Sequence, residues 1–326
     1  MKILVVHSGG IGDLLLALPA LRAFRRAFPE ASLELMGFPE RLSLIAQDLE
    51  ANSLHSIDQS GMAYFYAEEG FLPPRLVDFF SSFSTALILG QSQAQTLSEN
   101  LKRTGLKRVI HLPSFPPEGG EMHVSDYLVQ SLRPFGIEGP RLSYPLRLPG
   151  EAISFADDFL KRIGWKKGKR VLAIHPGSGS PAKNWNPQKF AFVADWAYQH
   201  ALIFLIFGPA HDGKDEVQQA MKKANPFIID LLPLPMLAAI LRSCTVYLGN
   251  DSGITHLAAM LGTPTLAIFG PTDPAVWGPR GPKVQIIGRG ESFAIRSREE
   301  RNTLTGQCIE RIVPEVVMER LAPFLK

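Results

Sequence analysis

Short aliphatic runs alternate with helical patterns along most of this chain of 326 residues. That alternation is typical of βαβ units, which build parallel α/β sheets. In the first half of the chain, strands are expected at Lys2–His7, Ser32–Gly37, Thr85–Gly90 and Lys107–His111. A second series of strands is expected at Arg170–His175, Ala201–Phe207, Thr245–Gly249 and Thr265–Phe269. The pattern therefore predicts an α/β fold with two parallel sheets.

A stretch rich in proline and glycine separates the two series. Arg133–Gly150 contains four prolines and three glycines, a composition that suits a linker or hinge. We therefore expect two Rossmann-like domains facing across a cleft, one at residues 1–150 and one at residues 151–326. A final helix is expected at Val313–Leu325, and the sequence leaves open whether it packs back on the first domain.

Composition excludes several classes of protein. Hydrophobic residues at 45% and charged residues at 20% are ordinary for a globular protein and exclude disorder as the main state. The net charge, 34 − 31 = +3, is too small to indicate nucleic-acid binding, which needs a concentrated basic stripe. Two cysteines, Cys244 and Cys308, fit a reducing compartment. Neither a signal peptide nor a run long enough to span a membrane is recognisable near Met1, so we expect a soluble cytoplasmic protein, attached at most to a membrane surface.

A glycine-rich turn follows the first expected strand. It brings Gly10 and Gly12 to the start of a helix, where backbone donors can approach an anion or a sugar hydroxyl. The turn is a poor dinucleotide fingerprint, because Leu15 stands where a third glycine should be, and this argues against an NAD-dependent oxidoreductase. Asp13 has two open interpretations, a helix cap or a carboxylate at the cleft edge that acts as a base.

A second glycine loop follows the first strand of the second series. His175–Ser180 and the nearby Lys183 combine small hydroxyl residues, a flexible backbone and a cation, a combination that suits a phosphate or diphosphate. The alternative for Lys183 is a solvated surface lysine.

The segment Gly249–His256 is more informative. It lies at the carboxyl end of an expected strand, where open α/β sheets bind ligands. Ser252 and His256 are four residues apart and share one face near a helix N-terminus, which offers unpaired N–H groups to an anion. A ligand contact is favoured over a purely structural histidine because Asp251 and Ser252 accompany His256.

Three blocks of the chain together resemble glycosyltransferase family 9, the ADP-heptose:lipopolysaccharide heptosyltransferases. The blocks are Gly12–Leu21, Pro176–Trp185 and Asp251–Ala259, with Gly262–Thr265 and Phe269–Thr272 continuing the last one. The resemblance implies a GT-B fold and an inverting mechanism without a metal. It also implies that the first domain binds the acceptor and the second domain binds the nucleotide-sugar.

The resemblance also assigns roles to single residues. Asp13 resembles the family's proposed catalytic base, and the turn with Gly10 and Gly12 falls on the acceptor side. The donor-binding positions of the family fall on Ser178, Lys183, Leu232, Asp251, Ser252, Gly253 and His256. Among these, Ser178 and Lys183 resemble the residues that hold the diphosphate, and Leu232 falls where a family residue contacts adenine. A family glutamate that contacts the ribose is replaced by Gly208-Pro209-Ala210, which leaves the identity of the nucleotide open.

The leading hypothesis is therefore transfer of a heptose, or a related sugar, from an ADP-sugar to a lipopolysaccharide-core or similar lipid-linked saccharide. The ADP-sugar is a co-substrate, and no other cofactor or metal is expected. Lys183 and the helix start at Ser252 would stabilise the leaving diphosphate. Two alternatives stay open: a sugar-nucleotide epimerase or hydrolase, and a binding protein without turnover.

Contact with the inner membrane surface has its own sequence argument. Arg22, Arg25 and Arg26 interleave with Phe24 and Phe28, and a second mixture of basic and aromatic residues covers Leu72–Phe80. Such mixtures suit an anionic membrane surface. The alternative is that the aromatic rings are core residues and the arginines are merely solvated.

Overall fold

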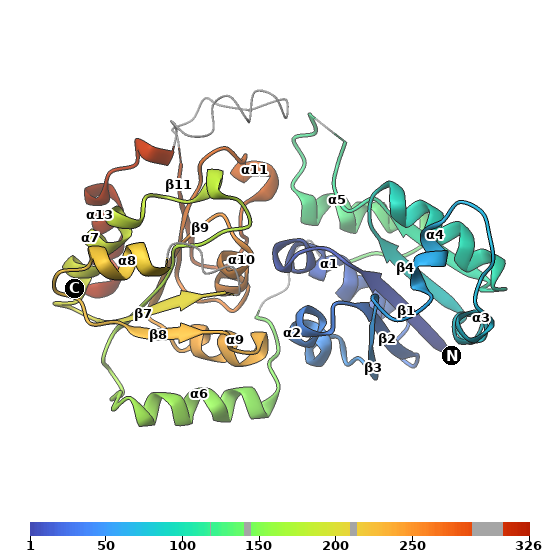
Figure 1. The fold of residues 1–326 in the computed structure, drawn as a ribbon, viewed down its shortest axis with the longest axis horizontal. Coiled ribbons are helices and arrows are strands. Elements are labelled where there is room, and N and C mark those ends of the chain that lie inside the picture. The colour runs from blue at the N-terminus through green and yellow to red at the C-terminus, as the bar shows by residue number, and fades with distance from the viewer. Residues whose placement is uncertain (118, 140–144, 209–213, 289–308) are drawn as a thin grey trace. The chain divides into compact units, whose positions relative to one another are not determined.

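The computed structural model describes residues 1–117, 119–139, 145–208, 214–288 and 309–326 (Figure 1). The chain forms two compact units. The first comprises Met1–Pro117 and Met122–Ser143, and the second comprises Tyr144–Lys326 with the short segment Glu118–Glu121. The division between residues 143 and 144 falls inside the stretch Arg133–Gly150 that we interpreted as a linker.

The first unit is built on a five-stranded parallel sheet in the order β3-β2-β1-β4-β5. Its strands are β1 (Lys2–His7), β2 (Ser32–Gly37), β3 (Ser53–Ser56), β4 (Thr85–Leu89) and β5 (Arg108–Leu112). The central β1 is a continuous apolar run, and its residues from Ile3 to Val6 are at most 2% exposed. Such burial is expected of a strand covered on both faces.

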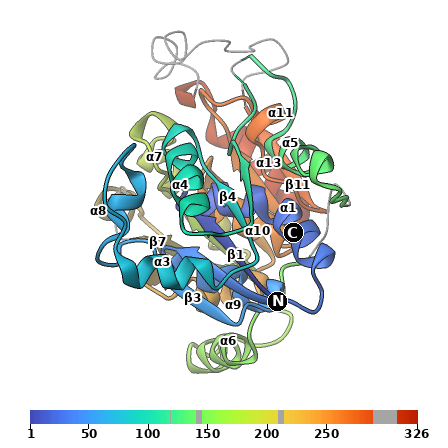
Figure 2. The ribbon, with the colours of Figure 1, turned by 90° about the vertical axis from the view of Figure 1, so that its right-hand side faces the viewer.

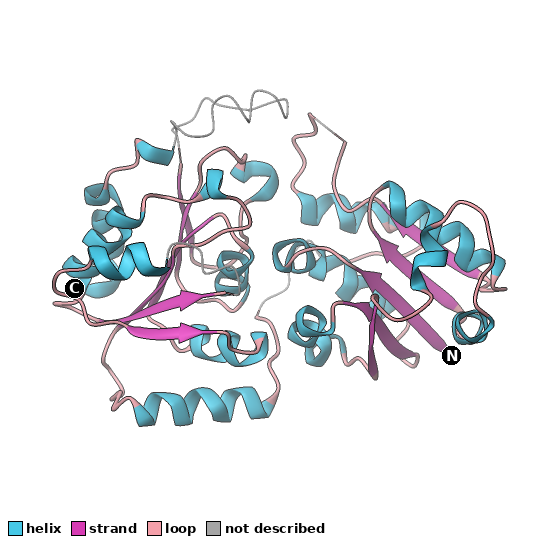
Figure 3. Ribbon diagram, viewed as in Figure 1, coloured by secondary structure: helices cyan, strands magenta, loops and turns pink. Residues whose placement is uncertain are grey.

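Helices cover both faces of this sheet (Figure 3). They are α1 (Ile11–Ala27), α2 (Pro39–Leu49), η1 (Met62–Tyr66), α3 (Pro74–Ser81), α4 (Ser92–Arg103), α5 (Val124–Ser131) and η2 (Arg133–Phe135). Helix α1 packs against α2 and α5, whereas η1 packs against α4. Phe65, Phe80 and Phe83 join residues of β1 and β4 in one apolar cluster under η1, α3 and α4.

The second unit contains a six-stranded parallel sheet in the order β11-β10-β9-β6-β7-β8. Its strands are β6 (Val171–His175), β7 (Leu202–Phe207), β8 (Phe227–Asp230), β9 (Val246–Asn250), β10 (Thr265–Ile268) and β11 (Val284–Ile287). The central strands β6 and β9 are buried throughout.

The helices of the second unit also form two layers. They are α6 (Gly150–Arg162), η3 (Pro181–Lys183), α7 (Pro187–Ala197), α8 (Lys214–Ala220), α9 (Leu234–Arg242), α10 (Gly253–Met260), α11 (Pro274–Trp277) and α13 (Pro314–Leu325). Helix α6 runs along α9 (Figures 1 and 2), and α13 packs against α7. Val317, Leu321 and Leu325 of α13 are at most 1% exposed and lie in the same cluster as Trp185 and Phe190. The buried face of the last helix thus belongs to the core of the second unit.

Two parallel sheets confirm the predicted α/β class, and every strand that the sequence predicts is present within one residue at either end. The strands that the sequence analysis missed are β3, β8 and β11. Each lies at the edge of its sheet and is short and partly exposed, so its sequence lacks the continuous apolar run of a central strand.

The order of each sheet fixes where a ligand can bind. In the first unit the strand order reverses between β1 and β4, and in the second unit it reverses between β6 and β9. Open α/β sheets bind ligands outside the carboxyl ends of the strands at such a switch point. The loops that follow these four strands are therefore the expected ligand-binding positions.

Candidate functional site

Asp13 lies in the first turn of α1, after the carboxyl end of β1. Gly10 is the N-cap residue, Gly12 is the second residue of the helix, and Asp13 is the third. The carboxylate Oδ2 of Asp13 accepts the backbone N–H of Gly10 at 3.0 Å. Asp13 therefore does not occupy the N-cap position, and the cap interpretation needs this correction. It caps the helix from the third position, where an acidic side chain reaches back to the N-cap N–H.

Gly9 brings three polar groups to the same turn. A Cβ atom at Gly9 would lie 3.0 Å from Cε1 of His7 and 3.1 Å from Oδ2 of Asp13, so a larger residue there would have to displace these side chains by a few tenths of an ångström. On the carbonyl side, Nη1 of Arg41 donates to the oxygen of Gly9 at 3.0 Å. The turn thus presents a partly exposed carboxylate on a backbone that is fixed from two sides.

The imidazole of His7 is buried beside this turn. Its burial, with the positive charge of Arg41 as a second cause, lowers the pKa of His7 to about 4. Burial in a low dielectric penalises the charged form, and a nearby cation does the same. His7 is therefore a neutral group near pH 7.

In the second unit, Lys183 and Asp251 form an ion pair. Nζ of Lys183, at the end of η3, lies 2.7 Å from Oδ2 of Asp251, which follows β9. The carboxylate side chain is only 7% exposed, whereas the lysine side chain is 32% exposed. The pair joins the loops after β6 and β9 across the switch point, and it excludes the interpretation of Lys183 as a merely solvated lysine.

A buried asparagine holds the same two loops together. Asn250 is fully buried; its Oδ1 accepts the N–H of Trp185 at 3.0 Å, and its Nδ2 donates to the carbonyl of Pro176 at 2.5 Å. Both partners belong to the loop after β6. The sequence analysis did not single out Asn250, although a polar residue between Gly249 and Asp251 at the end of an apolar strand is a usable signal.

Hydroxyl groups build the start of α10. Ser252 is the N-cap residue, and its Oγ accepts the N–H of Thr255 at 3.3 Å. The hydroxyl of Thr255 donates to the carbonyl of Asn250, and the hydroxyl of Tyr247 lies 3.0 Å from it. The tyrosine hydroxyl reaches this position because Gly249 has no side chain; a Cβ there would overlap it. The first N–H groups of α10 have no acceptor within the helix and are held at a defined place.

Ser178 shapes the loop after β6. Its hydroxyl donates to the carbonyl of Ser180 at 2.7 Å and accepts the N–H of Ser180 at 3.2 Å. These bonds close a tight turn of the kind that serine forms with the residue two positions later. A diphosphate that contacts this hydroxyl must compete with the bond to Ser180.

Within the second unit, the structure thus brings together most of the donor-binding residues that the sequence analysis selected. Lys183 contacts Asp251, which is followed by Ser252 and Gly253, and His256 lies one turn further along α10, where it is 7% exposed. Leu232 precedes α9, at the end of the edge strand β8. No described contact joins Leu232 to this group. Pro209, Ala210 and Cys308 lie outside the described residues.

Neither a metal cluster nor a membrane span is found in the described parts of the chain. No three His, Cys, Asp or Glu residues there could hold a metal ion together. Among the same residues, no helix is long and apolar enough to cross a membrane. Asp158 forms an exposed pair with Lys161 at 3.3 Å on α6.

Two of the three arginines of α1 are used within the fold, whereas Arg26 is exposed. Arg22 forms two bonds to the carboxylate of Asp48, at 2.6 and 2.7 Å, and Arg25 donates to the carbonyls of Phe28 and Ala31. Phe24 is fully buried. Phe24 therefore belongs to the core, as the alternative interpretation expects, but Arg22 and Arg25 are bonded within the fold and are not merely solvated. Phe80 of the second basic–aromatic segment is also fully buried, but Phe71, just before that segment, is 65% exposed.

Comparison with known proteins gives a consistent set of relatives. The model of glycosyltransferase family 9 (heptosyltransferase) matches residues 101–305, more than half of the chain. Lipopolysaccharide heptosyltransferase 3 of Escherichia coli K12 is 24% identical over 298 residues, with 82% of each chain covered. Lipooligosaccharide heptosyltransferase 2 of Haemophilus influenzae is 27% identical over 186 residues, and the chain spans about half of its length, 54%.

Solved structures agree along the whole chain. A family 9 glycosyl transferase from Veillonella parvula has a TM-score of 0.80 and 19% identity, with 99% of this chain and 97% of the other covered. The ADP-heptose lps heptosyltransferase II of E. coli has a TM-score of 0.74 and 19% identity, with coverage of 100% and 98%. This likeness establishes the GT-B type of fold.

Proposed function

The chain belongs to glycosyltransferase family 9 (heptosyltransferase), and on that premise we propose that it transfers a heptose, or a closely related sugar, from an ADP-sugar to a lipid-linked saccharide of the lipopolysaccharide-core type. The relatives named above are lipopolysaccharide and lipooligosaccharide heptosyltransferases, and one solved relative is an ADP-heptose enzyme. We further propose that the enzyme is cytoplasmic and works at the inner face of the membrane, where such an acceptor is anchored.

The observation that carries the proposal is the pairing of Lys183 with Asp251 beside the start of α10. A leaving diphosphate needs positive charge and backbone donors. The ammonium group has three protons, so it can keep its bond to Asp251 and still donate to a phosphate oxygen. The N-terminus of α10 adds N–H groups and the positive end of its dipole. Leu232 remains a proposed contact to the adenine of the donor. His256 remains a proposed donor contact from the first turns of α10.

The proposed acceptor chemistry needs one base. An acceptor hydroxyl attacks C1 of the sugar, the bond from C1 to the diphosphate breaks, and the hydroxyl proton passes to Asp13. A carboxylate is a weak base toward a free hydroxyl, but in a concerted step the proton moves as the new C–O bond makes the hydroxyl acidic. A single displacement of this kind inverts the configuration at C1. Because Lys183 and the α10 N-terminus neutralise the leaving group, we propose that no metal is required.

The test combines donor binding with transfer. A thermal-shift screen of ADP-, UDP- and GDP-sugars should show the largest stabilisation with ADP-heptose, since ligand binding to the native state raises its stability. Incubation of ADP-heptose with a heptose-deficient lipopolysaccharide core should yield ADP and a heptosylated core. EDTA should leave the rate unchanged, and NMR should show an inverted anomeric centre.

The same test separates the alternatives. Release of ADP and free or altered sugar without any acceptor would indicate the epimerase or hydrolase. Tight donor binding with no product from any acceptor would indicate a binding protein. Loss of activity in EDTA that Mg²⁺ restores would contradict the metal-independent step.

A further inference from the structure

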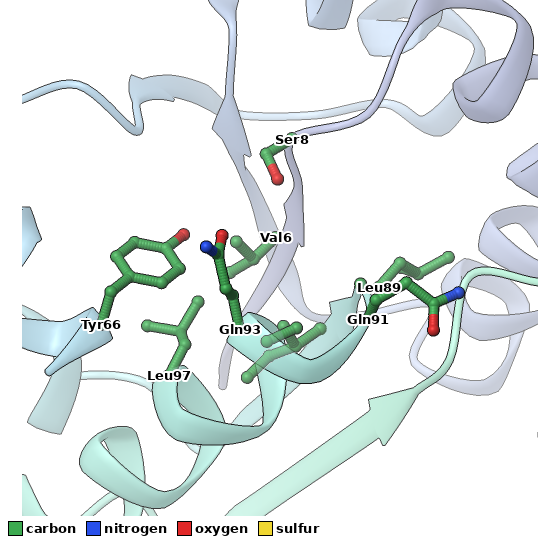
Figure 4. A pocket seen from close by; sticks show the side chains of 10 residues that line it. Val6, Ser8, Tyr66, Leu89, Gln91, Gln93 and Leu97 are labelled. Carbon is green, nitrogen blue, oxygen red and sulfur yellow. The ribbon is translucent and has the colours of Figure 1, made fainter. Parts of the chain in front are cut away.

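A small pocket opens at the switch point of the first unit. It has a volume of about 220 Å³ and lies between the loops that follow β1 and β4 (Figure 4). Val6, Ile88 and Leu97 contribute apolar surface to it, whereas Ser8, Tyr66 and Gln93 contribute polar groups. All of these residues belong to the first unit, so the pocket is complete within that unit.

The polar groups of this pocket have no partner of their own in the described parts of the chain. The hydroxyls of Ser8 and Tyr66 and the amide of Gln93 make no hydrogen bond there. Figure 4 shows all three pointing toward the same space, whereas the amide of Gln91 points away from it. Hydroxyl and amide groups both donate and accept hydrogen bonds, as sugar hydroxyls do.

The backbone around these groups is fixed. Nδ2 of Asn100 donates to the carbonyls of Phe65 and Ala67, at 3.0 and 2.8 Å, and so holds the end of η1 that carries Tyr66. Nε2 of His111 lies 3.1 Å from the carbonyl of Gly90. A Cβ atom at Gly90 would overlap the side chain of Ala94, so this loop depends on a glycine. The backbone of the pocket is therefore preformed, while Ser8 and Gln93 are themselves exposed residues.

The pocket lining carries no charge. None of its residues is Asp, Glu, Lys, Arg or His. Burial raises the pKa of Tyr66 to about 12, which keeps its phenol protonated, and His7, next to Ser8, is neutral as described above. Arg41 and Asp13 contact Gly9 and do not line the pocket. A carboxylate or phosphate would find no cation among the lining groups, which argues against an anionic ligand.

We infer that this pocket binds one neutral monosaccharide ring of the acceptor, with the sugar hydroxyls on Ser8, Tyr66 and Gln93 and its C–H groups on the apolar floor. The identification of this sugar as part of the acceptor rests on the proposed function. The volume is below the roughly 300–1,000 Å³ of sites for drug-sized ligands and suits a single ring. An acidic sugar of the acceptor, if it has one, binds elsewhere.

The first experiment measures sugar binding without donor or turnover. Saturation-transfer NMR uses a panel of neutral methyl pyranosides, a methyl glucuronide and adenosine with the full chain. At least one neutral glycoside should give a signal, and the Gln93→Ala variant should bind it roughly three- to tenfold more weakly, the scale of one lost hydrogen bond. Gln95→Ala is the matched control, since Gln95 is an exposed glutamine on the same helix that faces Glu99.

Three outcomes would overturn the inference: no neutral glycoside binds, Gln93→Ala and Gln95→Ala bind alike, or the glucuronide or adenosine is preferred. Kinetics gives a second readout. Gln93→Ala should raise the acceptor KM roughly three- to tenfold while kcat and the donor KM change less than about twofold, because a uniform binding contact is lost. Sugar binding at Gln93 without any transfer would refute the proposed function alone, and normal transfer with an unchanged acceptor KM would refute the pocket alone.

Discussion

At the switch points of the two units, the loops after β1 and β6 are alike, whereas the loops after β4 and β9 differ. Strands β1 and β6 end in buried histidines, His7 and His175, and each leads into a glycine-containing loop. Across the switch point, β4 of the first unit leads into Gly90-Gln91, whereas β9 of the second unit leads into Asp251-Ser252. One site is lined by uncharged groups, and the other holds an ion pair. The topology fixes where a ligand binds, and the residues after the strands decide its charge.

The two sites also differ in how their polar groups are satisfied. Asn250, Thr255 and Tyr247 bond to one another or to backbone, so the second site is organised before any ligand arrives. Ser8 and Gln93 of the first pocket have no such bonds in the described parts of the chain. A partly exposed cation beside ordered polar groups suits a charged leaving group, and an uncharged pocket with hydroxyl groups and one amide suits a sugar.

The largest expected effect is at Asp13, where one substitution distinguishes a catalytic base from a group that only caps the helix start. Asp13→Asn keeps an oxygen that can accept the N–H of Gly10, so the turn and the fold should persist. The variant loses the base, and turnover should fall about 100-fold or more, while the affinity for ADP-sugar stays unchanged. Steady-state kinetics and donor titration measure the two quantities.

Asp13→Ala is the companion variant. It loses the bond to Gly10 as well, and its free energy of unfolding should fall by about 1 kcal/mol, the usual net value of one hydrogen bond. An Asn variant with near-native turnover would show that Asp13 only organises the helix start, and the base would then have to be another group.

Lys183→Ala tests the charged site of the second unit. Hydrogen bonds to charged groups contribute about 1.5–3 kcal/mol, so the affinity for ADP should fall roughly 10- to 100-fold, measured by calorimetry. Lys161→Ala, which removes an exposed lysine of the same unit that is paired with Asp158, should leave the affinity unchanged.

Loss of Lys183 also leaves the carboxylate of Asp251 buried without its cation, and this destabilises the variant. The double variant Lys183→Ala/Asp251→Asn removes that charge as well. Its stability should recover, but its affinity for ADP should not. Recovery of both would mean that Lys183 serves the fold and not the diphosphate.

The neutral imidazole of His7 makes the first unit sensitive to acid. The pKa of His7 is about 4 in the folded state and about 6.5 when unfolded, so below pH 6.5 the unfolded state binds a proton that the folded state refuses. Stability is therefore full above pH 6.5 and falls toward pH 4; the expected loss between pH 7.5 and pH 5 is about 2 kcal/mol.

Urea unfolding at both pH values checks this, with His7→Gln as the variant that lacks the titrating group. All four tryptophans lie in the second unit, so their fluorescence follows that unit, while far-UV circular dichroism follows both. An equal pH dependence in the wild type and the His7→Gln variant would contradict the assignment.

The sequence predicted the central strands and the charged site because both are local patterns. Apolar runs mark β1 and β9, and Asp251 and Ser252 follow directly on such a run. Lys183 was assigned to the same site through the family resemblance, and in the structure its loop follows β6, the neighbour of β9. The edge strands β3, β8 and β11 were missed because partial exposure leaves them without such a run.

The pocket of the first unit shows what local patterns cannot reveal. Tyr66 comes from η1 and Gln93 from α4, and neither residue belongs to a recognisable motif. They meet because β4 returns to lie beside β1 after the excursion through β2 and β3. The same reasoning applies to Arg22, whose partner Asp48 is 26 residues away on α2. Because Arg22 is paired there, it no longer supports the membrane-surface interpretation of α1.

The smallest expected effect concerns membrane contact, and it also tests whether the lipid-linked acceptor belongs to the first unit. Tyr64 and Phe71 are 53% and 65% exposed, their rings lie 6.3 Å apart, and Arg75 is exposed nearby in sequence. Tyr64 is two residues from Tyr66, which lines the proposed sugar pocket. If the first unit takes a lipid-linked acceptor, we expect this patch to contact the membrane surface, through aromatic rings at the interface and attraction of arginine to anionic lipid.

Tyr64→Ser/Phe71→Ser should weaken binding to anionic vesicles about two- to fivefold at low salt, measured by co-sedimentation. Arg26→Ala on α1 should change it less. Vesicle binding that depends on Arg26 alone, or no binding at low salt, would contradict membrane contact through Tyr64 and Phe71.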